Sequence, residues 1–342
     1  MNLLCWEGYE ADSVLGEFAR KRNIKTNAQT LLSDTTTAHD LLNGSLSQWD
    51  VLNINNPWIR DFLCHHRMIR TLDEQRFEHT LTNLLPEFDR LSHWARDDNG
   101  NIIGVCQRFG AFNFVVNTRR IDHTSAEDQG FNLASDRTQR FGILTYDDFN
   151  LFHICLGAGI NPFHKLDDDA LQLFSNTAND WFDRALLISD DHLTLNRALV
   201  SGEIDFYISG GVYTVSEARL AGHDHLRAIT PTSGCIDGRG GIVFTEITSV
   251  LEHPQTSTHA VDFLEYITQP DIALRIATTA NTLNPVARMG DPAVLSKFSK
   301  QQLDAIQWDT LSADIDRCAM YRIPPNHTEL HKRLKAARDK NR

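Results

Sequence analysis

The side chains best suited to hold a small molecule come directly after a short apolar run at the start of the chain. Residues 3–9 read Leu-Leu-Cys-Trp-Glu-Gly-Tyr, so two aromatic rings and a carboxylate follow the apolar residues. Trp6 and Tyr9 offer flat, rigid surfaces, and Glu7 adds a negative charge. The chemistry that this set predicts is non-covalent binding of a small ligand.

Three later apolar runs also end in polar residues. In open α/β sheets small molecules bind beyond the carboxyl ends of the strands, so each of these ends is a candidate binding position. Asp147 and its neighbour Asp148 are also suited to cap the helix that follows, and this alternative stays open, as it does for Asn55 and Asn56. The candidate residues at these strand ends are Asn55, Trp58, Asp147 and Ser209.

Signals for catalysis or metal binding are weak. His327 and His331 share one face of a predicted helix, and Cys64-His65-His66 forms a second group, but neither has the third ligand nearby in the sequence that zinc requires. The chain contains no Gly-x-Ser-x-Gly, no phosphate-binding glycine loop and no evident cysteine-histidine nucleophile motif. We therefore expect no catalytic residues, no metal and no cofactor, which argues against an enzyme.

Composition favours a globular protein of two domains. The chain has 342 residues, of which 41% are hydrophobic, and a typical domain has roughly 150 residues. The net charge of −12 opposes a general affinity for nucleic acid. No apolar stretch approaches the roughly 20 residues of a membrane helix. The six cysteines form no Cys-x-x-Cys, and we expect them to be buried thiols.

Alternation of strands and helices predicts an α/β fold. Leu3 to Trp6 reads as a strand, Val14 to Lys21 as an amphipathic helix and Ile24 to Thr30 as the next strand, which together make a βαβ unit. The apolar, β-branched run Asn101 to Val105 continues into Cys106 to Phe114, and this stretch is predicted to be a strand that crosses between the lobes, with a hinge at Gly110. A basic helix is expected near the carboxyl end.

Several short segments, in their order and spacing, resemble one protein family. They are Cys5-Trp6-Glu7-Gly8-Tyr9, Trp49-Asp50-Val51, Gly202-Glu203-Ile204, and Ala260 to Arg275 followed by Asn284-Pro285. Together they resemble the bacterial extracellular solute-binding proteins of the spermidine/putrescine type, which serve ABC importers. The resemblance covers most of the chain. It implies a two-lobed periplasmic-binding-protein fold (type II, Venus flytrap), each lobe a mixed sheet flanked by helices, with a ligand cleft between the lobes.

The same resemblance sets the expected lobe boundaries. The chain is expected to cross between lobes three times, near residues 106–112, 234–241 and 284–290. Lobe 1 is expected to comprise residues 1–109 and 240–288, and lobe 2 residues 110–239 and 289–342.

The resemblance carries over to the binding residues only in part. Trp6 and Tyr9 match the family's first aromatic wall, and Asp147 matches an acidic residue that receives an amine. Where the family commonly has a second acid and a tryptophan, this chain has Asn150 and Ser209 (or its neighbour, a glycine). The resemblance alone therefore does not fix the ligand of this chain.

A change of charge in the last crossover points to a different ligand. An acid of the family's pattern is replaced by Arg239, or by Asp237 if the register slips. An uncompensated like charge in a closed cleft costs several kcal/mol, so an arginine there disfavours a bare polyamine. Arg108 and Arg239 suit bidentate capture of an acid group, although arginines near hinges also tie lobes together. We expect a ligand with an amine, held by Asp147 and Glu7, and an acid group, held by the arginines, around a body packed by Trp6, Tyr9 and Trp58.

The resemblance implies a monomer that gives its ligand to the permease and ATPase subunits of an ABC importer. It places the protein in the periplasm or at the cell surface, with a signal peptide trimmed before Met1. Three alternatives remain open: a true spermidine or putrescine binder, a ligand sensor coupled to a membrane signalling receptor, and an intracellular enzyme on the same fold.

Overall fold

Two long apolar segments form the strands β4 (Val105–Asn117) and β9 (Gly241–Val250), in which every residue is buried. The computed structural model describes residues 1–82, 84–86, 92–278 and 282–340. The chain forms two compact units, with unit 1 made of Met1–Phe109 and Phe244–Lys300 and unit 2 of Gly110–Val243 and Gln301–Arg342. β4 and β9 each pass from one unit to the other, because the divisions fall after Phe109 and Val243.

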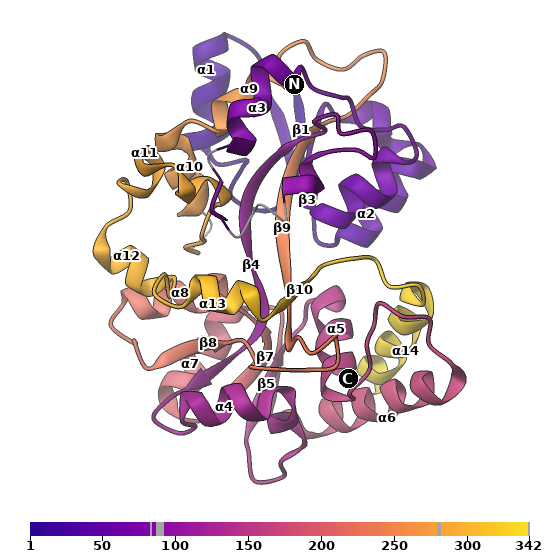
Figure 1. Ribbon diagram of the computed structural model, residues 1–342, viewed down its shortest axis with the longest axis vertical. Helices are drawn as coiled ribbons and strands as arrows, with labels where there is room; N and C mark the ends of the chain where they lie inside the picture. Colours follow the sequence, from indigo (N-terminus) through magenta and orange to yellow (C-terminus); the bar gives the residue numbers. More distant parts are fainter. Residues whose placement is uncertain (83, 87–91, 279–281, 341–342) are drawn as a thin grey trace. The chain divides into compact units, whose positions relative to one another are not determined.

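Each unit combines a sheet with helices, which confirms the α/β prediction (Figure 1). The first division of the chain falls where the lobe boundary is expected, after residue 109. The other two divisions, after Val243 and Lys300, lie further along the chain than the expected boundaries after residues 239 and 288. No helix among the described residues is long and apolar enough to cross a membrane.

In the sheet of unit 1, the three parallel strands β2 (Asn27–Thr30), β1 (Asn2–Cys5) and β3 (Val51–Asn55) are followed by the antiparallel strand β9, next to which β4 lies. β1 lies between β2 and β3 and is parallel to both, so their carboxyl ends meet at one edge. The second half of β9 pairs antiparallel with β3, with Asn55 opposite Glu246. This topology brings the residues that follow β1, β2 and β3 together at one place.

Helices of unit 1 bury apolar faces against this sheet. Phe18 packs edge-on against Phe263, with ring centroids 5.1 Å apart, in a core that also contains Leu3 and Val51. The helices are α1 (Glu17–Arg22), α2 (Asp34–Asp40), α3 (Glu74–Thr82), α9 (Ala260–Ile267), α10 (Pro270–Ala277) and α11 (Pro292–Leu295), with α12 (Lys300–Ala305) starting at the end of the unit and helical turns at Asp12–Gly16, Leu41–Ser45, Leu46–Gln48, Trp58–Cys64, Ser92–Ala95 and Ala287–Gly290.

The sheet of unit 2 has the order β6-β5-β7-β4-β8. β5 (Phe141–Leu144) is parallel to β6 (Leu187–Ser189) and β7 (Phe206–Gly210), and β4 is antiparallel to β7 and β8 (Leu226–Ile229). The short strand β10 (Cys318–Met320) runs parallel to the first residues of β9. The carboxyl ends of β5 and β7 therefore lie at the same edge, as those of β1 and β3 do in unit 1.

Unit 2 contains a group of three neighbouring helices, α5 (Asp147–Gly157), α6 (Asp168–Arg184) and the carboxyl-terminal α14 (His327–Lys340) (Figure 1). Trp181 of α6 and Leu330 and Leu334 of α14 are buried. The remaining helices of the unit are α4 (His123–Gln129), α7 (His192–Ser201), α8 (Val212–Leu220) and α13 (Leu311–Asp316), with a helical turn at Gly130–Ser135.

The crossing strand expected from Asn101 to Phe114 is present as β4, but it begins only at Val105 and continues to Asn117. Residues 95–103 instead form a local turn, in which the Asp97 amide donates to the Asn101 carbonyl (2.9 Å) and the Ile103 amide to the Ala95 carbonyl (2.8 Å). Ile102 pairs with Arg96 within this turn instead of extending the strand. The apolar pattern of the sequence does not reveal this pairing.

Removing the cap of α7 should destabilise unit 2. The Asp191 carboxylate accepts bonds from the amides of Leu193 (2.9 Å) and Thr194 (3.1 Å). We expect Asp191→Ala to lower the free energy of unfolding by about 1 kcal/mol. Urea denaturation measures this, and Asp190→Ala, at the exposed residue before the cap, is the matched control. Equal effects of the two substitutions would contradict the capping role.

Candidate functional site

A cluster of polar and aromatic residues lies at the carboxyl edge of the unit 1 sheet. Trp6 follows β1, Asp34 follows β2, and Asn55 ends β3. The indole Nε1 of Trp6 donates to Asp34 Oδ1 (3.0 Å), and the Asn55 amide Nδ2 donates to Asp34 Oδ2 (2.6 Å). Two of the predicted residues, Trp6 and Asn55, are thus brought together, and the acid that joins them was not predicted.

Asp34 is the residue that the sequence reasoning missed here. It is buried at 2% exposure and starts α2, directly after the turn that follows β2. The same strand-end rule that selected Trp6 would have selected it. Glu7 is half-buried beside this cluster, so an acid and an indole remain partly exposed at this edge.

Tyr9 and Arg108 form a second, buried group with Glu246 of β9. The Tyr9 hydroxyl donates to Glu246 Oε2 (2.7 Å), and Arg108 Nη2 lies 2.9 Å from Glu246 Oε1. The guanidinium also lies over the Tyr9 ring, with Cζ 5.0 Å from its centroid. Tyr9, Arg108 and Glu246 are 0%, 3% and 6% exposed. The structure therefore differs from the expectation of a free arginine and an open aromatic wall.

The cause of this difference is the acid in β9. A carboxylate buried in a sheet needs a cation and further donors, and Arg108 and Tyr9 supply them. Burial alone would lower the pKa of Arg108, but the charge of Glu246 outweighs burial, so the pKa rises and the guanidinium stays charged. The signal in the sequence was a single acid within the apolar run of β9.

Trp58 belongs to the core of unit 1. It is 2% exposed and packs edge-on against His39 (centroids 6.3 Å apart) and Phe62 (5.6 Å). The expectation that Trp58 packs against a ligand is not supported, because its ring already has protein neighbours. Asn55 is likewise 3% exposed and bound to Asp34.

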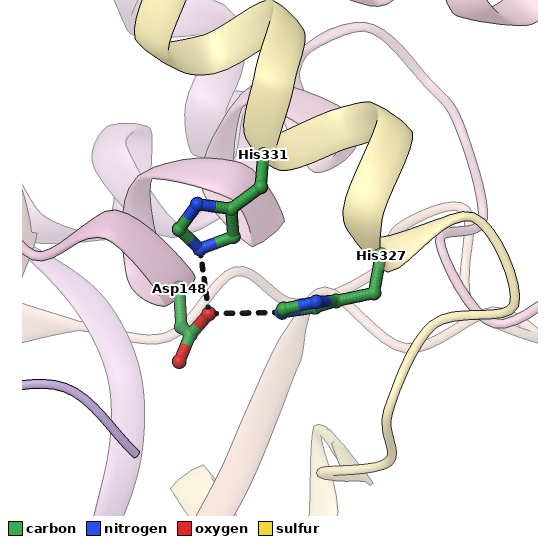
Figure 2. A group of neighbouring side chains, drawn as sticks. All are labelled: Asp148, His327 and His331. Atoms are coloured by element: carbon green, nitrogen blue, oxygen red, sulfur yellow. Dashed lines mark hydrogen bonds and ion pairs between the residues drawn. The ribbon is translucent and has the colours of Figure 1, made fainter. Parts of the chain in front are cut away.

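In unit 2, the two acids at the start of α5 contact α14. Asp147 forms an ion pair with Arg338, and Asp148 Oδ1 lies 3.1 Å from Nε2 of both His327 and His331 (Figure 2). The open alternative, in which these acids cap α5, is not what the structure shows, since the N-cap is Tyr146 and forms no side-chain cap bond.

Electrostatics of the Asp148 group favour the ionised acid. Burial by itself would raise the pKa of Asp148, but bonds from His327 and His331 outweigh it and hold the pKa well below its usual range. Burial also opposes the charge on His331, yet its bond to Asp148 raises the pKa of that imidazole. Asp147 thus has a protein cation at the position where a ligand amine was expected.

Ser209 lies inside unit 2, at a backbone φ of 68° near the end of β7. Its Oγ accepts from Asn150 Nδ2 (2.6 Å) and lies 2.9 Å from His153 Nδ1. A serine beside an imidazole is the geometry of an activated nucleophile. Ser209 and His153 are both 0% exposed, so this pair is closed to solvent in the structure.

Asp237 and Arg239 lie on a tight loop of unit 2. Asp237 is exposed at φ 51°, and Gly238 follows at φ +83°, a conformation that favours glycine. Arg239 Nη1 donates to the carbonyls of Asp316 (2.6 Å) and Cys318 (3.0 Å). Arg239 thus ties this loop to the segment around β10 within unit 2.

A cavity of about 430 Å³ in unit 1 contains none of the predicted residues. Several of its charged side chains are paired with one another, for example Arg60 with Asp98 (2.8 Å) and Arg70 with Glu252 (2.6 Å). This balance does not favour a ligand of either charge.

All six cysteines are free. The thiols of Cys5, Cys106, Cys155 and Cys318 are buried as predicted, whereas Cys64 and Cys235 are half-buried.

Several solved structures are similar in fold to this chain along nearly their whole length. The spermidine/putrescine ABC transporter substrate-binding protein PotD from Streptococcus pneumoniae is 14% identical, with a TM-score of 0.67, and the match covers 99% of each chain. The TpPotD lipoprotein of Treponema pallidum is 13% identical, with a TM-score of 0.73 and 99% of each chain covered. The chain has the periplasmic-binding-protein fold.

A third structure with the periplasmic-binding-protein fold was solved with a ligand. It is the binding protein MotA from Agrobacterium tumefaciens B6 in complex with glucopine, which is 12% identical with a TM-score of 0.63, over 100% of this chain and 98% of that one. No family model and no curated protein matches the chain. At these identities the likeness concerns the fold alone.

Proposed function

We propose that the protein is the substrate-binding component of an ABC importer and captures a small, amine-containing ligand. The observation that carries the proposal is the full-length likeness in fold to PotD and MotA. PotD is named as a spermidine/putrescine substrate-binding protein, and MotA was solved in complex with glucopine. The protein would act outside the cytoplasm, as a monomer, and pass its ligand to the permease and ATPase subunits. It would perform no chemistry on the ligand.

The acidic residues at the edge of the unit 1 sheet support the proposal that the ligand contains an amine. Trp6 and Glu7 are only partly buried there, and Asp34 lies within hydrogen-bonding distance of the indole. An aromatic face beside carboxylates is a favourable environment for an ammonium group, through cation–π attraction and ion pairing. Arg108 and Arg239 each have partners within their own unit, so neither supports an acid group on the ligand. The expectation that the ligand carries an acid group therefore rests on the likeness to MotA alone.

Calorimetric titration of the ligand-stripped protein tests the proposal. The panel contains spermidine, putrescine, amino acids and opine-type conjugates that carry an amine and an acid. Micromolar or tighter binding of a compound in either amine class supports the proposal. Tight binding of spermidine or putrescine would make a polyamine the ligand, and a hit confined to the conjugates would make it an amine-acid compound. Failure of every amine would overturn it.

Loss of the Trp6 indole should weaken binding of whichever amine is found. We expect Trp6→Ala to raise the Kd by about 10- to 100-fold, because an aromatic anchor contributes about 1.4–2.8 kcal/mol. Trp308→Ala, at a half-buried tryptophan of unit 2, is the control and should leave the Kd unchanged. An unchanged Kd in Trp6→Ala, with the protein folded, would place the ligand elsewhere.

A further inference from the structure

Two imidazoles and a carboxylate converge in unit 2, at the place where α14 meets α5. Figure 2 shows His327 and His331 on successive turns of α14, both directed toward Asp148 in the first turn of α5. Asp148 Oδ1 lies 3.1 Å from each Nε2, and the three potential ligand atoms lie within 4.8 Å of one another. Three donors of metal-binding type thus face a common point.

The spacing of these atoms fits a transition metal ion. In a tetrahedral zinc site, with metal–ligand distances of about 2.0–2.1 Å, two ligand atoms lie about 3.3 Å apart. The 3.1 Å separations from Asp148 Oδ1 to the two imidazoles are close to this value. The two Nε2 atoms, which lie within 4.8 Å of each other, would draw closer together around the ion. Two imidazoles with one carboxylate select against Ca²⁺ and Mg²⁺, which take oxygen ligands, and suit Zn²⁺.

The surroundings also suit a site held by three protein ligands. The side chains of Asp148, His327 and His331 are 11%, 10% and 25% exposed, so the group is sheltered but reaches solvent on the side of His331. The nearby cation Arg338 is paired with Asp147, which reduces its repulsion of a metal ion. The partly open side leaves room for a water molecule as a fourth ligand.

We propose that Asp148, His327 and His331 bind one Zn²⁺ ion, which fastens the carboxyl-terminal helix α14 to α5. Sequence spacing showed the two histidines on one helical face, and the acid that completes the set lies 179 residues before His327. Binding would cross-link two distant segments of unit 2. This site lies within unit 2 alone and does not depend on the proposed ligand or transport role.

Titration of the full-length, chelator-treated protein with ZnCl₂ tests the site. We expect one Zn²⁺ per chain by calorimetry, a rise of several degrees in Tm, and slower hydrogen exchange of the α14 amides. His331→Ala and Asp148→Asn should each weaken Zn²⁺ binding by more than about 100-fold, since loss even of an outer partner of a metal ligand costs roughly 10- to 100-fold. Co²⁺ in place of Zn²⁺ should give the visible absorption of a tetrahedral ion.

The control is His66→Ala, which alters the other histidine group of the sequence, in unit 1, and should bind Zn²⁺ as the unaltered protein does. Circular dichroism of each variant without metal shows whether it is folded, and two independent ligand variants guard against one that fails to fold. Binding that survives in both His331→Ala and Asp148→Asn, binding abolished by His66→Ala, or no binding at all would overturn the proposal. In the last case the group is a hydrogen-bonded cluster only.

Discussion

We expect replacement of Arg108 with alanine to lower the free energy of unfolding of the protein by about 3–5 kcal/mol. The substitution leaves Glu246 buried at 6% exposure without the cation that it faces at 2.9 Å. Only the Tyr9 hydroxyl would remain as a side-chain donor to that carboxylate among the bonds that the structure describes. Chemical denaturation followed by circular dichroism and fluorescence measures the loss.

The reason for so large an effect is desolvation. A buried carboxylate retains its charge only while an opposite charge and donors compensate for the lost water, so removing one partner costs more than the pair itself contributes. Arg108→Met combined with Glu246→Leu removes both charges and keeps side chains of similar volume. We expect this double variant to recover most of the stability, with the Tyr9 hydroxyl as the remaining unsatisfied group unless Tyr9→Phe is added.

An exposed ion pair of the same unit supplies the matched control. Arg70 and Glu252 also form an arginine–glutamate pair at 2.6 Å, but their side chains are 31% and 47% exposed. Arg70→Ala should therefore cost less than about 1 kcal/mol, because water replaces the lost partner. If Arg108→Ala costs no more than Arg70→Ala, Glu246 is not held as a buried ion, and the account of this group is wrong.

Some features of the site were evident from a single segment of the sequence. The strand β1 and the polar turn after it were evident from the residues themselves, and parallel pairing of β1 with β3 then brought Trp6 and Asn55 to one edge. The same holds for His327 and His331, whose spacing alone puts them on one helical face.

Contacts between residues that are far apart in the sequence could not be predicted from single segments. Arg108 and Glu246 are 138 residues apart, so the sequence could not show that the arginine expected to bind a ligand is committed to a strand of its own unit. Asp148 and His331 are 183 residues apart, and Arg239 reaches the Cys318 carbonyl across 79 residues. A charged residue was recognised in each case, but its partner depends on topology.

Acidification should destabilise unit 2 through His153. Burial is the main cause that lowers the pKa of this imidazole, to about 3, against an ordinary value of 6.5. The unfolded chain therefore takes up a proton that the folded chain rejects. The stabilising contribution is complete above pH 6.5 and is lost as the pH falls toward 3, by about 1.4 kcal/mol for each pH unit within that window.

The environment of His153 explains why the imidazole stays neutral. It is 0% exposed, stacks on Phe131 with ring centroids 4.6 Å apart, and has its Nδ1 2.9 Å from Ser209 Oγ. No charged group contributes to its pKa among the causes that the described residues supply. A proton on this ring would thus be a buried cation without a counter-ion.

His153→Phe keeps a ring for stacking and removes the titration. Between pH 6 and pH 4, the unaltered protein should lose roughly 3 kcal/mol more stability than this variant. The difference between the two unfolding profiles is the quantity to measure, because carboxylates that titrate in both proteins cancel. His164→Phe, at an exposed histidine of unit 2, should leave the profile of the unaltered protein in place. Parallel profiles for the unaltered protein and His153→Phe would mean that the buried ring accepts a proton as readily as an exposed imidazole. In that case the surroundings of His153 and Ser209 open to water before unit 2 unfolds.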